Sequence, residues 1–367
     1  MSPAMRRKIR LQNPWSFLNV TLSPEDVEQD EKVSNQQLVL LARESLDRIL
    51  AADAFDTDTG PAIYLYELST DKHTQTAVIA DIPVADYESG HVKIHEQVRT
   101  HRAELLAEHL YQLGVSSSPI ALTYRNTRTL AGLISHCQNA RRPTLRIPAT
   151  HGVQQTVWTI TDPLTIDQFV NGFSSLTLYI IDGHHRAAAS TSVSKKVNGE
   201  PAQRLFGAMF PHDSLKLQGF NRWLLRDEQF DPAGLSETLR VQCSASTLAS
   251  FQPPRQGEIV TYINGAWQLV VLPENNQFDS QQLFEQIFSS ILNIQAPDDP
   301  RIINIPGDQP ITELQRLVDQ QGAAGFVMAP LTIDDFITAA DQNILLPPKS
   351  TYFTPKVQSG LFLRSIR

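Results

Sequence analysis

The segment LTLYIIDGHHRAAAS, residues 176–190, joins a short apolar run to a charged turn and then to three alanines. The run at 176–182 predicts a strand, because it is apolar and of strand length. Asp182 and Gly183 end this run, and the residues from Arg186 to about Lys195 favour a helix. The segment therefore predicts a strand whose carboxyl end opens into a helix N-terminus, the place where open sheets with helices bind ligands.

The flanking sequence continues this alternation of strands and helices. An amphipathic helix is expected at 35–50, a second in the latter half of 91–114, which Gly114 ends, and helical segments after each of the strands at 119–124 and 156–161. Other strands are expected at 62–68, 76–84 and 203–210. The acidic segment SPEDVEQDEK, 23–32, is expected to be a solvated loop. The pattern indicates an α+β (mixed α/β) layered fold.

The Pro-rich stretch FQPPRQGE, which begins at Phe251, is the best candidate for a linker. We therefore expect one domain at 1–250 and a smaller α+β domain at 251–367. In the smaller domain, Asn264-Gly265 predicts a tight hairpin turn within 258–272. Helices are expected at about 280–292, 310–321 and 332–343, and a strand at 324–330. The tail LLPPKSTYFTPKVQSGLFL, 345–363, is too rich in proline to form a helix.

Composition limits the possible functions. The 367 residues carry a formal net charge of -8, so the chain is a poor match for nucleic acid or an anionic membrane. No apolar run is long enough to cross a bilayer, and the beginning of the sequence lacks the apolar core of a signal peptide. We expect a soluble cytoplasmic protein. The two cysteines, Cys137 and Cys243, lack metal-type spacing and are expected to be buried thiols without a disulfide.

The five residues Asp182 to Arg186 have the chemistry of an anion site. Gly183 lets a ligand approach the backbone, and Arg186 can donate two parallel hydrogen bonds to a phosphate. His184 and His185 add donors that titrate near neutral pH. Asp182 can hold a divalent cation or polarise a hydroxyl. The alternative is structural: Asp182 caps the helix, the histidines cover a surface turn, and Arg186 makes an ion pair.

Two further segments carry polar groups of the same kind. In HVKIHE, 91–96, His91 and His95 would share one face of a helix and could bind zinc, whereas a strand end would point His95 and Glu96 to opposite sides. The tail contains two cations and three hydroxyls that could hold a phosphate or a carboxylate, or could protect a strand edge from pairing: Lys349, Ser350, Thr351, Tyr352 and Lys356.

IIDGHHRAAAS resembles the signature of the uncharacterised family numbered 1015 among the domains of unknown function. That family is related to free-serine kinases built on the ParB/sulfiredoxin fold. The segment from Tyr64 to Val98 and the PPKSTYF tail are also similar to family motifs, so the resemblance covers nearly the whole chain. Where many members carry a His-Arg pair, this chain has Asn221-Arg222. The resemblance implies a ParB/sulfiredoxin-like N-terminal domain.

The resemblance implies a kinase that uses ATP or ADP with Mg²⁺ and phosphorylates the hydroxyl of a small metabolite such as free serine. Glu96 would be the base, since the related kinases use a carboxylate for this step. Asp182 and His185 would also act in catalysis, with Asp182 as the metal ligand and His95 at the substrate. The nucleotide phosphates would be bound by Gly183, His184, Arg186, Arg222, Lys349, Ser350 and Thr351.

Two other functions fit the same residues. One is a switch protein that binds or hydrolyses nucleotide without transfer to a small molecule. The other is a metal-dependent hydrolase built on His91, His95 and the histidine pair at 184 and 185. In each case we expect a small-molecule ligand, no nucleic acid or membrane partner, and a homodimer.

Overall fold

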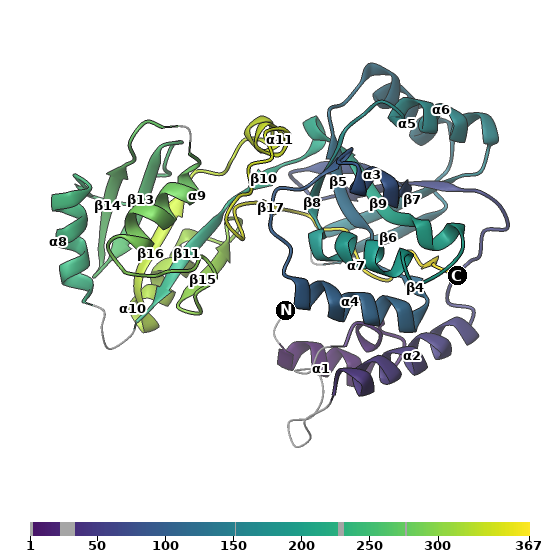
Figure 1. Cartoon of the computed structure of the whole chain (residues 1–367), viewed down its shortest axis with the longest axis horizontal. Coiled ribbons are helices and arrows are strands. Elements are labelled where there is room, and N and C mark those ends of the chain that lie inside the picture. The colour runs from purple at the N-terminus through teal and green to yellow at the C-terminus, as the bar shows by residue number, and fades with distance from the viewer. Residues whose placement is uncertain (1–2, 23–33, 151, 227–230, 276) are drawn as a thin grey trace. The chain divides into compact units, whose positions relative to one another are not determined.

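The computed structural model describes residues 3–22, 34–150, 152–226, 231–275 and 277–367. The chain has the α+β composition that the sequence predicts, and it divides into two compact units (Figure 1). The first unit consists of Met1–Lys93, Val98–Ser214 and Pro355–Arg367, and the second of Ile94–Gln97 and Leu215–Thr354. The expected loop at 23–32 lies outside the described residues.

The first unit is built on an eight-stranded sheet in the order β3-β8-β5-β9-β2-β1-β7-β6. The pairs β3/β8 and β5/β9 are parallel and the other pairs are antiparallel. Because β8 and β5 run in opposite directions, Asp182 at the end of β8 pairs with Ala121 near the start of β5. The strands are β1 (Ile63–Ser69), β2 (Thr74–Pro83), β3 (Val92–Lys93), β5 (Ile120–Tyr124), β6 (Leu145–Thr150), β7 (Val153–Ile160), β8 (Leu178–Asp182) and β9 (Arg204–Pro211).

Helices cover both faces of this sheet. Figure 1 shows α5 (Arg128–Ala140) and α6 (Pro163–Phe173) on one side, and α4 (Thr100–Leu113) and α7 (His184–Ser194) on the other. All residues of β5 are buried, which is typical of a strand covered on both faces. Of the shorter helices, α3 (Val84–Glu88) and η4 (His212–Ser214) each follow a strand and precede another, and η3 (Glu200–Gln203) lies between α7 and β9.

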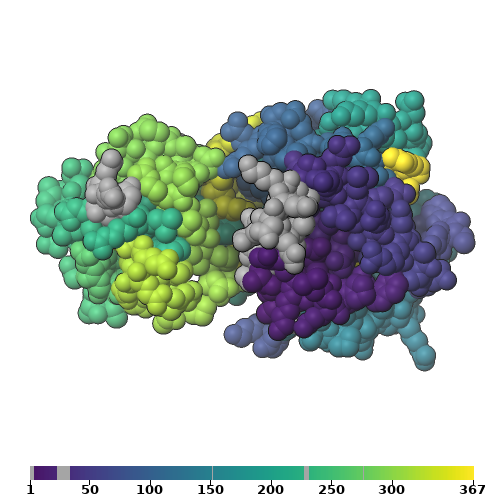
Figure 2. Space-filling view, turned by 90° about the horizontal axis from the view of Figure 1, so that it is seen from below, coloured from purple at the N-terminus to yellow at the C-terminus, as the bar shows by residue number. Residues whose placement is uncertain are grey.

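The N-terminal helices form a further layer that packs on α4. They are α1 (Pro3–Gln12), η1 (Phe17–Asn19) and α2 (Asn35–Ala51), and the purple atoms of Figure 2 show that they lie together on one face of this unit. The predicted helix at 35–50 is confirmed as α2, whose Leu46 is buried against Leu113 of α4. The sequence did not predict α1, because a short helix with a polar composition lacks a strong apolar period.

The C-terminal tail returns to the first unit. There β18 (Arg364–Ser365) pairs with β4 (Val115–Ser116), and Ile366 is buried. The expected division after residue 250 therefore differs from the observed one, in which Ile94–Gln97 also belong to the second unit. Residues 215–250 already belong to the second unit, and Pro355–Arg367 belong to the first. The Pro-rich stretch at 251–258 is not a linker between domains. It lies inside the second unit, because β11 (Phe220–Leu225) pairs with strands that follow this stretch in the chain.

The second unit is built on a six-stranded antiparallel sheet in the order β12-β14-β13-β16-β11-β15. The predicted hairpin is confirmed, since Asn264 and Gly265 both have positive φ, 50° and 76°, between two of these strands. The remaining strands are β12 (Ser246–Leu248), β13 (Glu258–Ile263), β14 (Ala266–Val271), β15 (Ile302–Pro306) and β16 (Gly322–Met328), with a separate pair, β10 (Leu217–Gln218) and β17 (Tyr352–Phe353).

The helices of the second unit agree with the sequence pattern at two of the three expected places, and α8 (Pro232–Gln242) was not expected. The expected helix at 280–292 begins as α9 (Asp279–Gln282) and continues as the π-helix η5 (Leu283–Ser289). The others are α10 (Ile311–Gln321) and α11 (Ile333–Asp341). Both cysteines are free thiols as expected, with Cys137 buried and Cys243 half-buried. Among the residues that the structure describes, no helix has the length and apolar character needed to cross a membrane.

The packing of Gly322 gives a direct test of the second unit. A Cβ at this position would overlap Nε1 of Trp223 and lie 2.7 Å from the Cα of Val318. We expect Gly322→Ala to lower the free energy of unfolding by about 1–3 kcal/mol, because backbone and a large ring must both move. Urea denaturation followed by tryptophan fluorescence measures this change.

Gly219→Ala is the matched control in the same unit. A Cβ there would meet its nearest atom, the Cα of Pro330, at an ordinary 3.5 Å. We expect this variant to stay within about 0.5 kcal/mol of the unchanged protein. Equal costs for the two substitutions would contradict the packing described here.

Candidate functional site

The DGHHR segment forms the turn between β8 and α7. The strand ends at Asp182, and Gly183 is the N-cap of the helix with φ 111° and ψ 25°. The helix thus begins at His184, two residues earlier than the sequence predicted, and its first intrahelical hydrogen bond runs from the N–H of Ala187 to the carbonyl of Gly183 at 2.9 Å. Among the residues that the structure describes, no side chain makes a capping hydrogen bond at this end of the helix. A helix N-terminus of this kind presents N–H groups and partial positive charge.

Glycine is required at position 183 for two reasons. A positive φ of 111° is strained for residues with a side chain. In addition, a Cβ at this position would lie 2.9 Å from Nη2 and 3.0 Å from Cζ of Arg186. The guanidinium of Arg186 therefore packs directly against the backbone of the turn.

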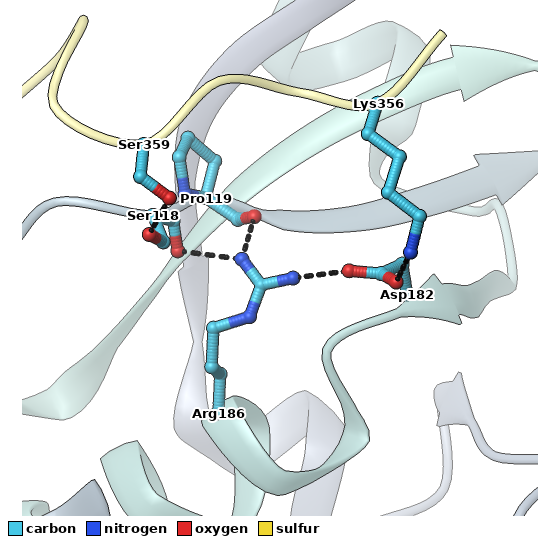
Figure 3. Close-up of polar contacts among 6 residues, drawn as sticks. All are labelled: Ser118, Pro119, Asp182, Arg186, Lys356 and Ser359. Atoms are coloured by element: carbon cyan, nitrogen blue, oxygen red, sulfur yellow. Dashed lines mark hydrogen bonds and ion pairs between the residues drawn. The ribbon is translucent and has the colours of Figure 1, made fainter. Parts of the chain in front are cut away.

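Arg186 holds three parts of the first unit together (Figure 3). Its Nη1 donates to the carbonyls of Ser118 at 3.0 Å and Pro119 at 2.5 Å, and its Nη2 donates to Oδ2 of Asp182 at 2.5 Å. Burial lowers the pKa of the Arg186 guanidinium, and the charge and hydrogen bond of Asp182 act in the opposite direction. Arg186 therefore makes the ion pair that the structural interpretation of the motif expected. Through these three hydrogen bonds, Arg186 positions Asp182.

Asp182 interacts with a second cation. Its Oδ1 accepts from Nζ of Lys356 at 2.6 Å, so one carboxylate lies between the guanidinium of Arg186 and the ammonium of Lys356. The side chains of Asp182 and Lys356 are 36% and 48% exposed. The sequence contained Lys356 among the polar residues of the tail, but no pattern indicated that it would reach Asp182, from which 174 residues separate it.

The tail is anchored close to Lys356 on both sides. The carbonyl of Pro355 accepts from the buried Gln75 at 2.8 Å, and Oγ of Ser359 lies 2.5 Å from Oγ of Ser118 (Figure 3). Further along, the ring of Phe362 contacts Tyr64 and Tyr66. These contacts fix the lysine at the end of β8, and they involve residues that the sequence did not single out.

The two histidines of the motif have different surroundings. His184 is buried, with 5% of its surface exposed. His185 is half-buried and accepts through Nε2 from the N–H of Arg99 at 3.1 Å, at the N-cap of α4. An imidazole that accepts through Nε2 carries its hydrogen on Nδ1 when it is neutral. His185 therefore links the start of α7 to the start of α4.

The residues predicted around HVKIHE belong to both units. His91 is exposed and lies in the first unit, whereas His95 and Glu96 lie in the second. Residues 91–99 contain the short strand β3 and no helix, so the helical arrangement of His91 and His95 proposed for zinc is wrong. A helix does not form because Val92 and Lys93 pair with β8 instead.

Within the second unit, His95 is packed against the tail motif. Its Nε2 lies 3.2 Å from Oγ1 of Thr351, and its ring meets Phe336 edge-on at a centroid distance of 4.6 Å. The backbone carbonyl of His95 accepts from the N–H of Leu346 at 2.8 Å. Glu96, the next residue, is half-buried. The strand-end alternative, in which these two side chains point to opposite sides, does not match this segment either, because a ligand atom of His95 and one of Glu96 lie within 4.8 Å of each other.

Arg222 and the PPKS segment also contact one another in the second unit. Arg222 is buried and donates to the carbonyls of Phe220, Pro348 and Lys349 at 3.1, 3.4 and 2.9 Å, and burial lowers its pKa to about 10. Lys349 has φ 61° and places its ammonium 5.6 Å from the ring centre of Phe220. Oγ of Ser350 donates to the carbonyl of Pro347 at 2.7 Å.

A family model with the description "Protein of unknown function (DUF1015)" matches residues 1–293. The chain belongs to this family, as its motifs predicted. No curated protein matches it.

Several solved structures are similar to the chain at low identity. SbnI of Staphylococcus aureus with a C-terminal truncation is 12% identical at a TM-score of 0.42, over 78% of this chain and 87% of that one. A free serine kinase in complex with AMP is 12% identical at a TM-score of 0.40, over 77% and 92%. A conserved hypothetical protein from Pyrococcus furiosus is 13% identical at 0.40, over 78% and 95%.

The geometry of Arg186 predicts how the turn responds to substitution. We expect Arg186→Lys to lower the free energy of unfolding by about 1–3 kcal/mol, because lysine cannot supply the fork that reaches two carbonyls and a carboxylate. Lys356→Gln should cost about 1 kcal/mol or less, since that ion pair is half exposed. Chemical denaturation measures both free energies of unfolding. A larger loss for Lys356→Gln than for Arg186→Lys would contradict the positioning role of Arg186.

Proposed function

We propose that the chain is a nucleotide-dependent phosphotransferase that phosphorylates the hydroxyl of a small metabolite. The observation that carries the proposal is the Asp182 carboxylate held between Arg186 and Lys356 at the N-terminus of α7. The positively charged side chains of Arg186 and Lys356 thus lie beside a helix N-terminus. This combination attracts the phosphates of a nucleotide.

Lys356 is the cation that would exchange between Asp182 and a phosphate. Its ammonium donates to Asp182, and an ammonium can donate to more than one acceptor. Its side chain is 48% exposed, so an incoming phosphate oxygen can reach it. Arg186 would stay in place, because its bonds to Ser118 and Pro119 belong to the scaffold.

Asp182 fits the requirements of Mg²⁺. This ion prefers hard oxygen ligands and is commonly held by one or two carboxylates together with substrate phosphates. The exposed fraction of the Asp182 side chain, 36%, leaves the carboxylate accessible. When bound there, Mg²⁺ would neutralise charge that develops on the transferred phosphoryl group.

The remaining roles follow the family resemblance. The acceptor oxygen would attack the terminal phosphorus, the bond from that phosphorus to the nucleotide would break, and the hydroxyl proton would pass to Glu96. The products are a phosphomonoester and ADP from ATP, or AMP from ADP. Free serine or a similar alcohol is the proposed acceptor, and His95 would lie at the acceptor.

The other proposed phosphate ligands divide between the units. Gly183 and His184 would offer backbone N–H groups, and the Nδ1–H of His185 would donate to a phosphate oxygen during transfer. In the second unit, Lys349, Ser350 and Thr351 are the proposed anion ligands. Arg222 would act by positioning Lys349, whose carbonyl it holds at 2.9 Å.

The test measures phosphoryl transfer directly. The full chain is incubated with ATP or ADP, Mg²⁺ and L-serine, and ³¹P NMR follows the phosphomonoester. We expect Glu96→Gln to lower kcat about 100-fold or more, because a base contributes that much to proton transfer. Lys356→Gln should raise the KM for nucleotide about tenfold with a smaller change in kcat.

Lys195→Gln is the matched control, because this lysine lies at the other end of α7 and pairs with Glu88. We expect its kinetics to be unchanged. If no alcohol is phosphorylated with either nucleotide, and Asp182→Asn binds nucleotide as tightly as the unchanged protein, the proposal is wrong.

One contact favours the switch protein as a second candidate. Lys356 links the tail to Asp182, so a ligand that draws Lys356 away would alter how the tail is held. This candidate predicts nucleotide binding or slow hydrolysis without phosphorylation of any alcohol. It also predicts that nucleotide increases hydrogen exchange in residues 355–367, whereas a transferase with a fixed tail would show protection.

A further inference from the structure

The first unit contains a cavity of about 290 Å³ that is separate from the DGHHR turn. It lies against the face of the sheet that α6 covers, whereas α7 lies on the opposite face (Figure 1). The side chains of Val78 and Met209 pair across β2 and β9 at its base, and Ala80 lies two residues along the same strand face. The cavity and the DGHHR turn lie at opposite ends of β8, because Leu178, which lines the cavity, is the first residue of this strand and Asp182 is the last.

The walls of the cavity are apolar and aromatic. Phe169 and Phe173 of α6 contribute two phenyl rings, and Leu176 and Leu178 approach from the start of β8. Phe169 is 2% exposed, so its ring belongs to the core of the unit. A ring-sized apolar group can make close contacts on several sides in such a space.

Packing around the cavity keeps it open. Phe173 meets Tyr124 edge-on at a centroid distance of 4.9 Å, which fixes one wall to β5. Gly172 packs so closely on Leu130 of α5 that a Cβ would lie 2.7 Å from Cδ2 of that leucine. Because α6 is held at this distance and position 80 carries only a methyl group, the side chains do not fill the space.

Two aspartates and a histidine are among the polar residues that line the cavity. Asp86 of α3 is half-buried and lines the cavity, as does the exposed His91, whose Nδ1 lies 3.1 Å from Oγ of Ser89. The other lining carboxylate, Asp81, accepts two hydrogen bonds from Arg364 at 2.5 and 2.8 Å. Asp86 is therefore the carboxylate that a ligand cation would meet.

We propose that this cavity binds a small molecule with a ring-sized apolar body and an amine. The apolar body would lie between the phenyl rings of α6 and the sheet, and the ammonium would donate to Asp86. A carboxylate beside an apolar cavity favours a cation over a neutral group of the same shape, and it disfavours an anion. This site is independent of phosphoryl transfer, since none of its lining residues belongs to the DGHHR turn.

The probe is 2-phenylethylamine, compared with neutral 2-phenylethanol and anionic 3-phenylpropanoate in calorimetric titrations of the full chain. We expect the amine to bind about tenfold more tightly than the alcohol, and the acid to bind weakest. Asp86→Asn should remove this preference and leave the affinity for the alcohol unchanged. Asp167→Asn is the matched control, because Asp167 is an exposed carboxylate of α6 outside the cavity lining.

Two substitutions test the place of binding. Ala80→Leu fills the cavity from its floor and should abolish binding of the amine. Val170→Trp changes a lining residue that is 60% exposed, so it obstructs the cavity without altering the core. Binding of the amine that survives Val170→Trp in a folded protein, equal affinity for amine and alcohol, or no binding of either probe would each overturn the proposal.

Discussion

The guanidinium of Arg186 packs on the backbone of Gly183, and the arrangement of the candidate site depends on this contact. Arg186 reaches the start of β5 through two carbonyls and the end of β8 through Asp182. A side chain at position 183 would occupy the space of this guanidinium, so the contact requires glycine at 183 as well as arginine at 186. The fixed Asp182 then has one oxygen to offer Lys356, and the positive end of α7 lies beside this pair.

Chain connectivity determines which cation reaches Asp182. The chain leaves the first unit after Ser214 and returns at Pro355, so most of the second unit is an insertion in the sequence of the first. Lys356 lies just beyond the point of return, where Gln75 holds the backbone of Pro355. An ammonium can therefore meet Asp182 only if the returning tail is docked on the sheet.

The turn and the cavity offer different chemistry because they lie at different parts of one sheet. At the end of β8 the backbone leaves the sheet, so polar side chains and a helix N-terminus gather there. On the face beneath α6, side chains from adjacent strands form an apolar floor that reaches Val78 and Met209. An anion suits the first place, and an apolar amine suits the second.

The sequence by itself determined the elements whose signals are local. The apolar run before Asp182, the Asn264-Gly265 turn and the helix stop at Gly114 follow from short-range sterics and periodicity. Only the tertiary structure decided where the units divide, that Arg186 binds carbonyls of the scaffold, and that Lys356 meets Asp182. Those contacts join segments that are far apart in the chain. Their strength depends on burial and geometry, which a local sequence pattern does not reveal.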